Sequence, residues 1–133
     1  MLIPSEGFDF FKKVRVLVQN SVPKNHNITI HCWSSEDDLG THKLAPNAIF
    51  SWHFRVNWKL STKFLCDFTT VYGSGNYAVY DSIQAESCHR YCFWKIKEEG
   101  PCLIVPNEKE YAYCQDWKHP ATNALAPNAL APN

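Results

Sequence analysis

The sequence lacks several features that would place it in common functional classes. No run of about 18 apolar residues occurs, so no helix is predicted to cross a membrane and no membrane insertion is expected. The 13 Lys and Arg residues balance the 13 Asp and Glu residues, so the broad positive field of a nucleic-acid-binding protein is missing. We therefore expect no nucleic-acid partner.

Motifs of familiar catalytic and metal sites are also missing. The six histidines form no HExxH motif, and no GxSxG motif is present (His26, His31, His42, His53, His89 and His119). A zinc site at Cys88, His89 and Cys92 would need a fourth ligand and free thiols. The acidic clusters at 36–38 and 98–99 are expected to face solvent. We predict no enzyme activity, no cofactor and no metal site.

Neither end of the chain is predicted to belong to the folded domain. Residues 1–12 lack the apolar core of a signal peptide, so secretion would require a leader already removed, with Met1 added for expression. Residues 120–133 repeat ALAPN and indicate a low-complexity tail or one added for expression. Residues 13–119 are predicted to form a single secreted domain.

Six cysteines are the most informative feature that is present. They are scattered without a CxxC pair, which favours disulfides in an oxidising compartment over a metal site (Cys32, Cys66, Cys88, Cys92, Cys102 and Cys114). Asn27-Ile28-Thr29 is an N-glycosylation sequon, which also fits secretion. Both observations indicate an extracellular protein.

Apolar residues alternate with polar ones through most of the chain, as in Val14, Val16 and Val18. This pattern predicts about eight short strands, at 14–18, 28–32, 52–54, 64–68, 77–80, 92–96, 103–105 and 111–113. Turns are predicted at 23–27, 36–40, 45–47, 73–76, 98–101 and 106–110, and a short helical turn at 81–86. The predicted fold is an all-β, antiparallel β-sandwich stabilised by disulfides.

Alternation also places several cysteines on the buried face of their strands. Cys32, Cys66 and Cys92 share a face with bulky apolar neighbours and are expected to point into the core. Cys102 and Cys114 flank a predicted hairpin and are expected to pair. Because an extended strand would carry Cys88 away from Cys92, these two are expected to pair separately with Cys32 and Cys66.

A series of motifs gives the chain a family resemblance. ITIHCWSSEDDLGTHKL is followed by FSWHFRVNW, FLCDF, YAVYD, CHRYCFWKIKEEGPC and YCQDW. This order, over residues 13–117, resembles the plant self-incompatibility S-protein family, also called S-protein homologues. The resemblance leads us to expect four cysteines, with Cys102 and Cys114 as additions.

The resemblance implies a secreted β-sandwich of the pistil that is not an enzyme. Such a protein is similar to a stigmatic ligand that meets a pollen plasma-membrane receptor, after which calcium enters and incompatible pollen is arrested. It is expected to act as a monomer. Two alternatives stay open: a secreted developmental or defence factor of the same family, and a secreted ribonuclease, for which no paired-histidine motif is present.

Receptor contacts are expected on loops, because strands hold the framework of a sandwich. The candidates are Asp37 and Asp38 in the DDLG turn, Ser74 and Asn76 in the GSGN segment, and Glu98 and Glu99 in the EEGP turn, with Trp58 as an exposed aromatic residue. The DDLG motif is expected to hold its turn through Asp side-chain hydrogen bonds. Discrimination between partners is therefore expected from Asn76, Glu98 and Glu99.

Overall fold

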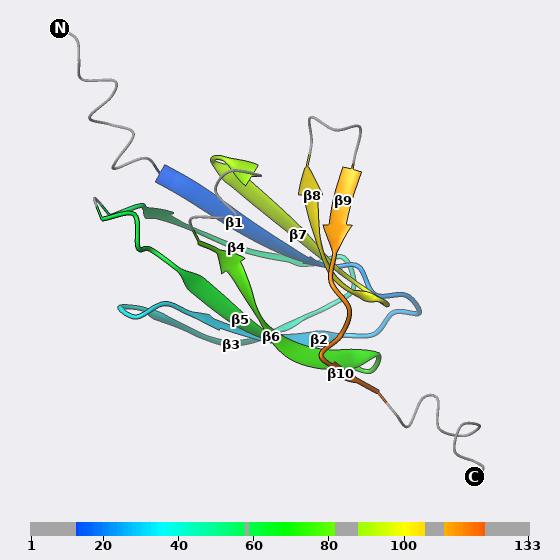
Figure 1. The fold of residues 1–133 in the computed structure, drawn as a ribbon. Helices are drawn as coiled ribbons and strands as arrows, with labels where there is room; N and C mark the ends of the chain where they lie inside the picture. The colour runs from blue at the N-terminus through cyan, green and yellow to red at the C-terminus, as the bar shows by residue number, and fades with distance from the viewer. Residues whose placement is uncertain (1–12, 58, 82–87, 106–110, 122–133) are drawn as a thin grey trace, which may run out of the picture.

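Two five-stranded sheets face each other in the computed structural model, which describes residues 13–57, 59–81, 88–105 and 111–121 (Figure 1). Sheet A has the order β4-β1-β7-β8-β9, and sheet B has the order β10-β6-β5-β2-β3. The strands are β1 (Lys13–Asn20), β2 (Ile28–Trp33), β3 (Asp38–Leu44), β4 (Ile49–Arg55), β5 (Phe64–Thr70), β6 (Gly73–Tyr80), β7 (Tyr91–Lys97), β8 (Gly100–Val105), β9 (Tyr111–Cys114) and β10 (His119–Pro120). The predicted all-β sandwich is confirmed.

Strand pairing departs from a purely antiparallel pattern at one place. β1 runs antiparallel to β4 but parallel to β7, with Val16 opposite both Trp52 and Cys92. All other described pairs are antiparallel. The parallel pair is possible because β1 and β7 are not consecutive strands: β2 to β6 lie between them in the sequence.

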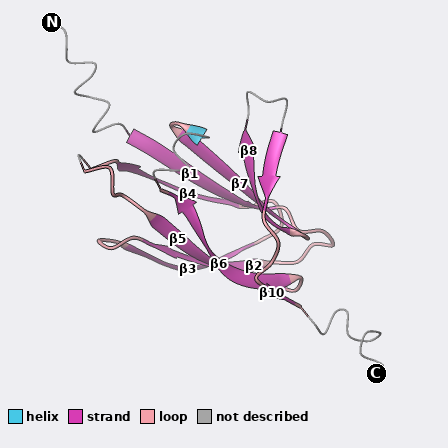
Figure 2. Cartoon of the chain, viewed as in Figure 1, coloured by secondary structure: helices cyan, strands magenta, loops and turns pink. Residues whose placement is uncertain are grey.

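The core lies between the sheets and follows the predicted alternation. Strands account for most of the chain in Figure 2. Every second residue of β1 is fully buried from Val14 to Val18, and Ile28 and Ile30 of β2 face them from the other sheet. Burial of such side chains contributes roughly 1.5–3 kcal/mol each, so this apolar layer is the main stabilising element of the fold.

Two strands and one strand start were not expected from the sequence. β3 has a mixed burial pattern because it is an edge strand, and β10 has only two residues, so neither shows clear alternation. The prediction that the GSGN segment at 73–76 forms a loop is wrong, because β6 begins at Gly73. Aromatic rings pack so closely against its two glycines that a side chain would not fit. A Cβ atom on Gly73 would lie 2.4 Å from the Trp117 ring, and one on Gly75 would lie 2.7 Å from the Tyr77 ring.

The cysteines form three disulfides, of which one was expected. Cys102 and Cys114 lie opposite each other on β8 and β9 and are bonded, as predicted. Cys32 and Cys66 are likewise opposite each other on β2 and β5, with 4.0 Å between their Cα atoms.

The expectation that Cys88 and Cys92 find separate partners is wrong, because they are bonded to each other. Cys88 does not continue the strand: β7 begins at Tyr91, and His89 has a left-handed backbone with a φ of 56°. The chain therefore turns back and brings the two Cα atoms to 4.9 Å. Cys32, Cys66 and Cys92 are all fully buried, as expected.

The strand directions divide the sandwich into two ends. We call the end where β1, β5 and β7 begin the loop end; it carries residues 34–37, 56–57, 59–63 and 88–90. The opposite end, which we call the turn end, carries the turns 21–27, 45–48, 71–72 and 98–99. The predicted turns at 23–27 and 45–47 are confirmed there. The turns predicted at 98–101 and 36–40 are shorter than expected, because β8 begins at Gly100 and β3 begins at Asp38. The predictions at 81–86 and 106–110 lie largely or wholly outside the described residues.

A buried asparagine holds two connections of the turn end together. Asn20 is fully buried, and its Nδ2 donates to the carbonyl oxygens of His26 at 2.8 Å and Leu44 at 3.0 Å. Its Oδ1 accepts a hydrogen bond of 3.1 Å from the Val22 amide. All side-chain polar groups of Asn20 are thus engaged, and the β1–β2 and β3–β4 connections are tied to one another.

A C-terminal segment closes one side of the sandwich. This strap (residues 115–118) runs from β9 of sheet A to β10 of sheet B (Figure 1). Tyr77 Oη donates to the Asp116 carbonyl and accepts from the Lys118 amide, both at 2.8 Å. Trp117 is buried, and its Nε1 donates to the Glu98 carbonyl at 2.8 Å. Pro120 of β10 lies one residue beyond the domain boundary expected from the sequence.

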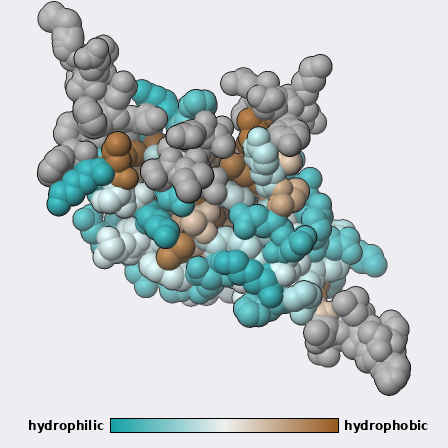
Figure 3. All heavy atoms as spheres, in the orientation of Figure 1, coloured by the Kyte–Doolittle hydropathy of each residue, from teal (hydrophilic) through white to brown (hydrophobic). Residues whose placement is uncertain are grey.

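The visible surface is largely polar. Figure 3 shows hydrophobic side chains as separate brown areas among hydrophilic ones on the uncovered part of this face. Within the described residues, no helix is both long and apolar enough to span a membrane.

Candidate functional site

The DDLG segment at the loop end is built around the side chain of Asp38. Asp38 Oδ1 accepts a hydrogen bond of 2.9 Å from the Gly40 amide and lies 2.7 Å from His31 Nε2. The Gly40 N–H, and after it the His31 ring, hold the pKa of the Asp38 carboxyl below its ordinary value. Gly40 has a φ of 82°, which explains why glycine stands there. The expectation that an Asp side chain holds this segment is confirmed for Asp38.

The residues before Asp38 are held by a serine. Ser34 Oγ accepts hydrogen bonds from the amides of Asp37 at 3.1 Å and Glu36 at 3.3 Å, and the Ser34 amide donates to the Asp37 carbonyl at 2.7 Å. The carboxylates of Glu36 and Asp37 are exposed. The backbone is thus fixed while these two side chains face solvent, which suits contact with a partner.

A polar row crosses the outer face of sheet B beside this loop. His31 pairs with Asp38, and its ring lies 5.0 Å from the Trp33 ring. On the next strand Asp67 stands opposite His31 and accepts a hydrogen bond of 2.8 Å from Asn76 Nδ2. Four strands therefore present one continuous polar row, from β3 through β2 and β5 to β6.

Two hollows flank the loop at 34–37. One has a volume of about 380 Å³ and carries four carboxylates; it is lined by His31, Trp33, Ser34, Ser35, Glu36, Asp37, Asp38 and Asp67. The other has a volume of about 530 Å³ and mixed charge, since its lining includes Arg55, Lys59 and Lys63 as well as Glu36 and Asp37. The loop at 34–37 thus forms a wall shared by an acidic and a mixed hollow.

The structure brings some predicted contact residues together and separates others. Asp37 and Asp38 line the acidic hollow, and Asn76 reaches it through its hydrogen bond to Asp67. Glu98 and Glu99 are exposed but belong to the turn end, so one compact partner surface does not include both groups.

Three further predicted positions have different surroundings. Ser74 is half-buried within β6, so it does not belong to a loop. Asn27 is exposed directly before β2 at the turn end, where a glycan would not cover the acidic hollow. Trp58 lies outside the described residues.

Sequence reasoning missed His31 and Asp67, which belong to predicted strands and not to loops. The signal that could have found them is the disulfide Cys32–Cys66: once this pair is chosen, antiparallel register places His31 opposite Asp67. A wrong pairing expectation therefore hid the polar row.

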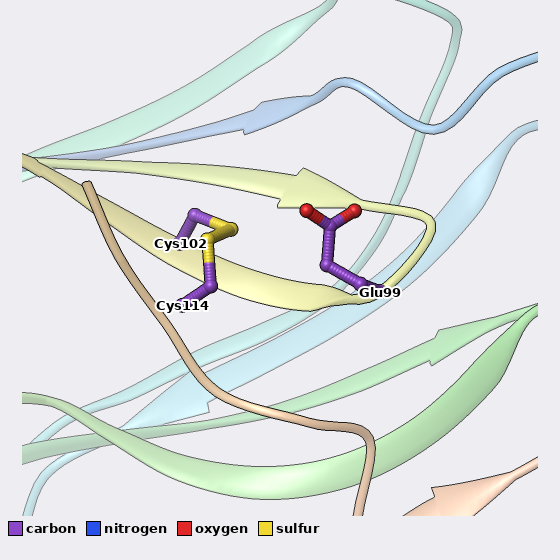
Figure 4. Close-up of side chains that lie close together, drawn as sticks. All are labelled: Glu99, Cys102 and Cys114. Carbon is purple, nitrogen blue, oxygen red and sulfur yellow. A yellow bond between two sulfur atoms is a disulfide. The ribbon is translucent and has the colours of Figure 1, made fainter. Parts of the chain in front are cut away.

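One group of possible metal ligands occurs among the described residues. The ligand atoms of Glu99, Cys102 and Cys114 lie within 4.8 Å of one another. Figure 4 shows that the two sulfur atoms are joined, with Glu99 beside them. A disulfide offers no thiolate, so this group does not form a metal site in the oxidised protein.

Comparisons with known proteins place the sandwich among plant proteins. Residues 15–117 match the family described as Plant self-incompatibility protein S1. S-protein homolog 29 of Arabidopsis thaliana is 30% identical over 114 residues, which cover 84% of this chain and 82% of the relative. S-protein homolog 3 of Arabidopsis thaliana is 31% identical over 106 residues, covering 77% and 71%.

A solved structure has the same fold. It is described as a structure of self-incompatibility protein homologues, "a widespread family of small, highly stable, secreted proteins from plants". The TM-score is 0.61 at 12% identity, and the match covers 80% of this chain and 96% of the other. At this identity the likeness concerns the fold.

Proposed function

Because the chain belongs to the plant self-incompatibility protein S1 family, we propose that it is a secreted stigmatic ligand recognised by a pollen plasma-membrane receptor. Binding would trigger calcium entry and arrest of incompatible pollen. The observation that carries this proposal is the family match over residues 15–117, which spans almost all of the described sandwich. Secretion is supported by three disulfides and by the exposed sequon residue Asn27.

The geometry supports a binding role more than a catalytic one. His31 is the one histidine in the acidic hollow, and its partner Asp38 is already engaged by the Gly40 amide. The pair thus serves to hold β2 and β3 together. Asp67 stands opposite His31 in this hollow, but its carboxylate accepts a hydrogen bond from Asn76, and no second histidine belongs to the described lining, so the pair of histidines used in acid–base cleavage of RNA is not formed here.

We place the receptor contact at the loop end. Glu36 and Asp37 project from a loop whose backbone is fixed by Ser34, and two hollows lie on either side of it. Because the loop backbone is already fixed, it loses little further backbone entropy on binding, which favours specific recognition. Glu98 and Glu99 would contribute through a separate contact at the turn end.

A second function within the same family is favoured by the names of the relatives. The matched Arabidopsis proteins are called S-protein homologs, and the solved structure is described as belonging to a widespread plant family. These descriptions mention neither pollen nor stigma, so the alternative that we propose is a secreted signal in development or defence. It would use the same fold and the same exposed loop.

Pollen of known haplotypes separates the two functions. The oxidised protein is added to each pollen line, and tube growth and cytosolic calcium are measured. Arrest with a calcium rise in one haplotype class is expected from a self-incompatibility ligand. Silence in every line, with three disulfides confirmed by intact mass, would overturn that role and favour the alternative.

Substitutions locate the contact once a responding line is found. Glu36→Ala with Asp37→Ala is expected to reduce the response strongly, because both side chains lie on the shared wall of the hollows. Glu98→Ala with Glu99→Ala removes the same charge from the turn end and is compared with it; a smaller loss of the response is expected. A larger loss from the Glu98 and Glu99 pair would move the main contact to the turn end.

A further inference from the structure

The two sheets differ sharply in charge although the whole chain is neutral. The strands of sheet A contain no Asp or Glu but carry the cations Lys13, Arg15, Arg55, Lys95 and Lys97. The strands of sheet B carry Asp38, Asp67 and Lys43. The outer face of sheet A is therefore a positively charged surface, which the net charge of the sequence conceals.

A hollow of about 280 Å³ lies at the loop end of this face. It is lined by Lys13, Val14, Arg15, His53, Arg90 and Tyr91, and no carboxylate belongs to this described lining. Arg15 is central, because it stands between His53 on β4 and Tyr91 on β7. The Arg15 amide also donates to the Arg90 carbonyl at 2.8 Å, which fixes the chain at Arg90 beside β1.

The hollow borders a sheet edge. β4 is the outer strand of sheet A and, in the described part of the chain, pairs with β1 alone. Ser51, His53 and Arg55 are exposed along it. An edge strand of seven residues presents backbone N–H and C=O groups to which an extended chain can pair.

We propose that this edge and hollow form a docking site for an extended acidic segment of a partner protein. The segment adds to sheet A as a strand beside β4, with its carboxylates next to His53 and in the positive field of Arg15 and Arg90. Alternate residues of a strand lie roughly 6.5–7 Å apart, so acidic side chains at every second position match the spacing of the exposed His53 and Arg55 along β4.

Charge and backbone geometry favour this occupant over others. A second copy of the chain would bring two cationic edges together, and like charges repel. A carboxylated polysaccharide would satisfy the cations but has no regular peptide N–H and C=O groups for the β4 edge. This proposal does not depend on the pollen receptor, because purified protein and synthetic peptides suffice to test it.

Binding of synthetic peptides to the oxidised full chain tests the proposal. An alternating Val-Glu peptide is the probe, and an alternating Val-Lys peptide and an oligouronate are compared with it by fluorescence anisotropy. The Val-Glu peptide is expected to bind and to shift the NMR signals of the β4 backbone amides. Its affinity is expected to fall as the salt concentration rises. Equal or tighter binding of the oligouronate would overturn the proposal, leaving a general anion-binding face.

Backbone pairing is tested by methylating alternate peptide nitrogens, which removes hydrogen-bond donors without changing charge. Loss of most of the affinity is expected from strand addition. Unchanged affinity would show that charge alone holds the peptide and would overturn the docking mode.

Charge reversal locates the site on the protein. Arg15→Glu with Arg90→Glu is expected to weaken Val-Glu binding about tenfold or more. Lys24→Glu with Lys43→Glu makes the same change in net charge at the turn end and on sheet B, and is expected to weaken it less than about threefold. Equal losses would overturn the location. If the reversal variant fails to fold, Arg15→Gln with Arg90→Gln replaces it.

Discussion

The two ends of the sandwich are held by different kinds of hydrogen bond. At the turn end, Asn20 is fully buried and ties two connections together. At the loop end, Asn57 Oδ1 accepts from the Ser61 amide at 2.9 Å, and Ser34 holds the loop at 34–37, both within single surface loops. The hydrogen bonds of Asn20 at the turn end thus join separate connections within the core, whereas those of Asn57 and Ser34 at the loop end hold only their own surface loops.

This difference indicates where the sequence is free to vary. A buried polar group that loses its partner pays the cost of desolvation, whereas an exposed one turns to water. Changes at the loop end should therefore alter the surface with little loss of stability. That is the behaviour expected of a recognition surface on a rigid framework.

The largest expected difference between the ends comes from two asparagines. Asn20→Ala leaves the His26 carbonyl, the Leu44 carbonyl and the Val22 amide without their partner, and should lower the free energy of unfolding by about 3 kcal/mol. Asn57→Ala should lower it by about 1 kcal/mol. Urea unfolding at neutral pH measures both values. Equal losses would remove the proposed distinction between the ends.

Two glycines give the next comparison. A Cβ atom on Gly100 at the turn end would lie 1.8 Å from the Gln115 carbonyl oxygen, so Gly100→Ala must displace the strap. This substitution should lower the free energy of unfolding by about 2–3 kcal/mol. Gly40 at the loop end also has a positive φ, but its Cβ atom would lie 3.7 Å from His42 Nε2. Gly40→Ala should therefore cost only backbone strain of about 1 kcal/mol. Thermal unfolding ranks the two variants, and the reverse order would contradict this reading.

Tyr77 allows the strap to be loosened without removing its ring. Tyr77→Phe deletes the hydroxyl that links Asp116 and Lys118, and should lower the free energy of unfolding by about 1 kcal/mol. Burial raises the pKa of Tyr77, while the Lys118 amide lowers it and Asp116 raises it further. Because the folded pKa is raised, this contribution is present below the unfolded pKa near 10 and is lost as the pH rises through the folded pKa.

Stability measured across alkaline pH therefore sharpens the test. The natural protein should lose more stability than Tyr77→Phe above about pH 10. Burial also raises the pKa of Tyr80, so both proteins keep some alkaline sensitivity. Parallel curves for the two would show that Tyr77 does not hold the strap.

The smallest effect is expected from Asp38. Its lowered folded pKa means that its contribution is present above the ordinary Asp pKa near 4 and is lost as the pH falls through the folded value. His31→Ala should raise the Asp38 pKa only in part, because the Gly40 amide is the larger cause. NMR titration of the Asp38 carboxyl measures the shift. A return to the ordinary value in His31→Ala would mean that the ring alone sets it.

Local patterns predicted the framework well and the surface poorly. The alternation of Val14, Val16 and Val18 identified β1 and its buried face, since this pattern needs only neighbouring residues. Glycines at 73 and 75 were interpreted as loop signals, whereas the structure uses them to admit the rings of Trp117 and Tyr77. A glycine in a loop and a glycine under an aromatic ring look alike in the sequence, because the ring belongs to another residue of the chain.

The sequence by itself determined eight of the ten described strands, the buried faces of most of those eight, the oxidised cysteines and the family. Tertiary structure alone decided that Cys88 pairs with Cys92, that His31 stands opposite Asp67, and that Glu98 lies at the other end from Asp37. The reason is physical. Alternation is a property of one strand, whereas register and direction depend on which distant strands pair, and only pairing brings side chains from different strands into one surface.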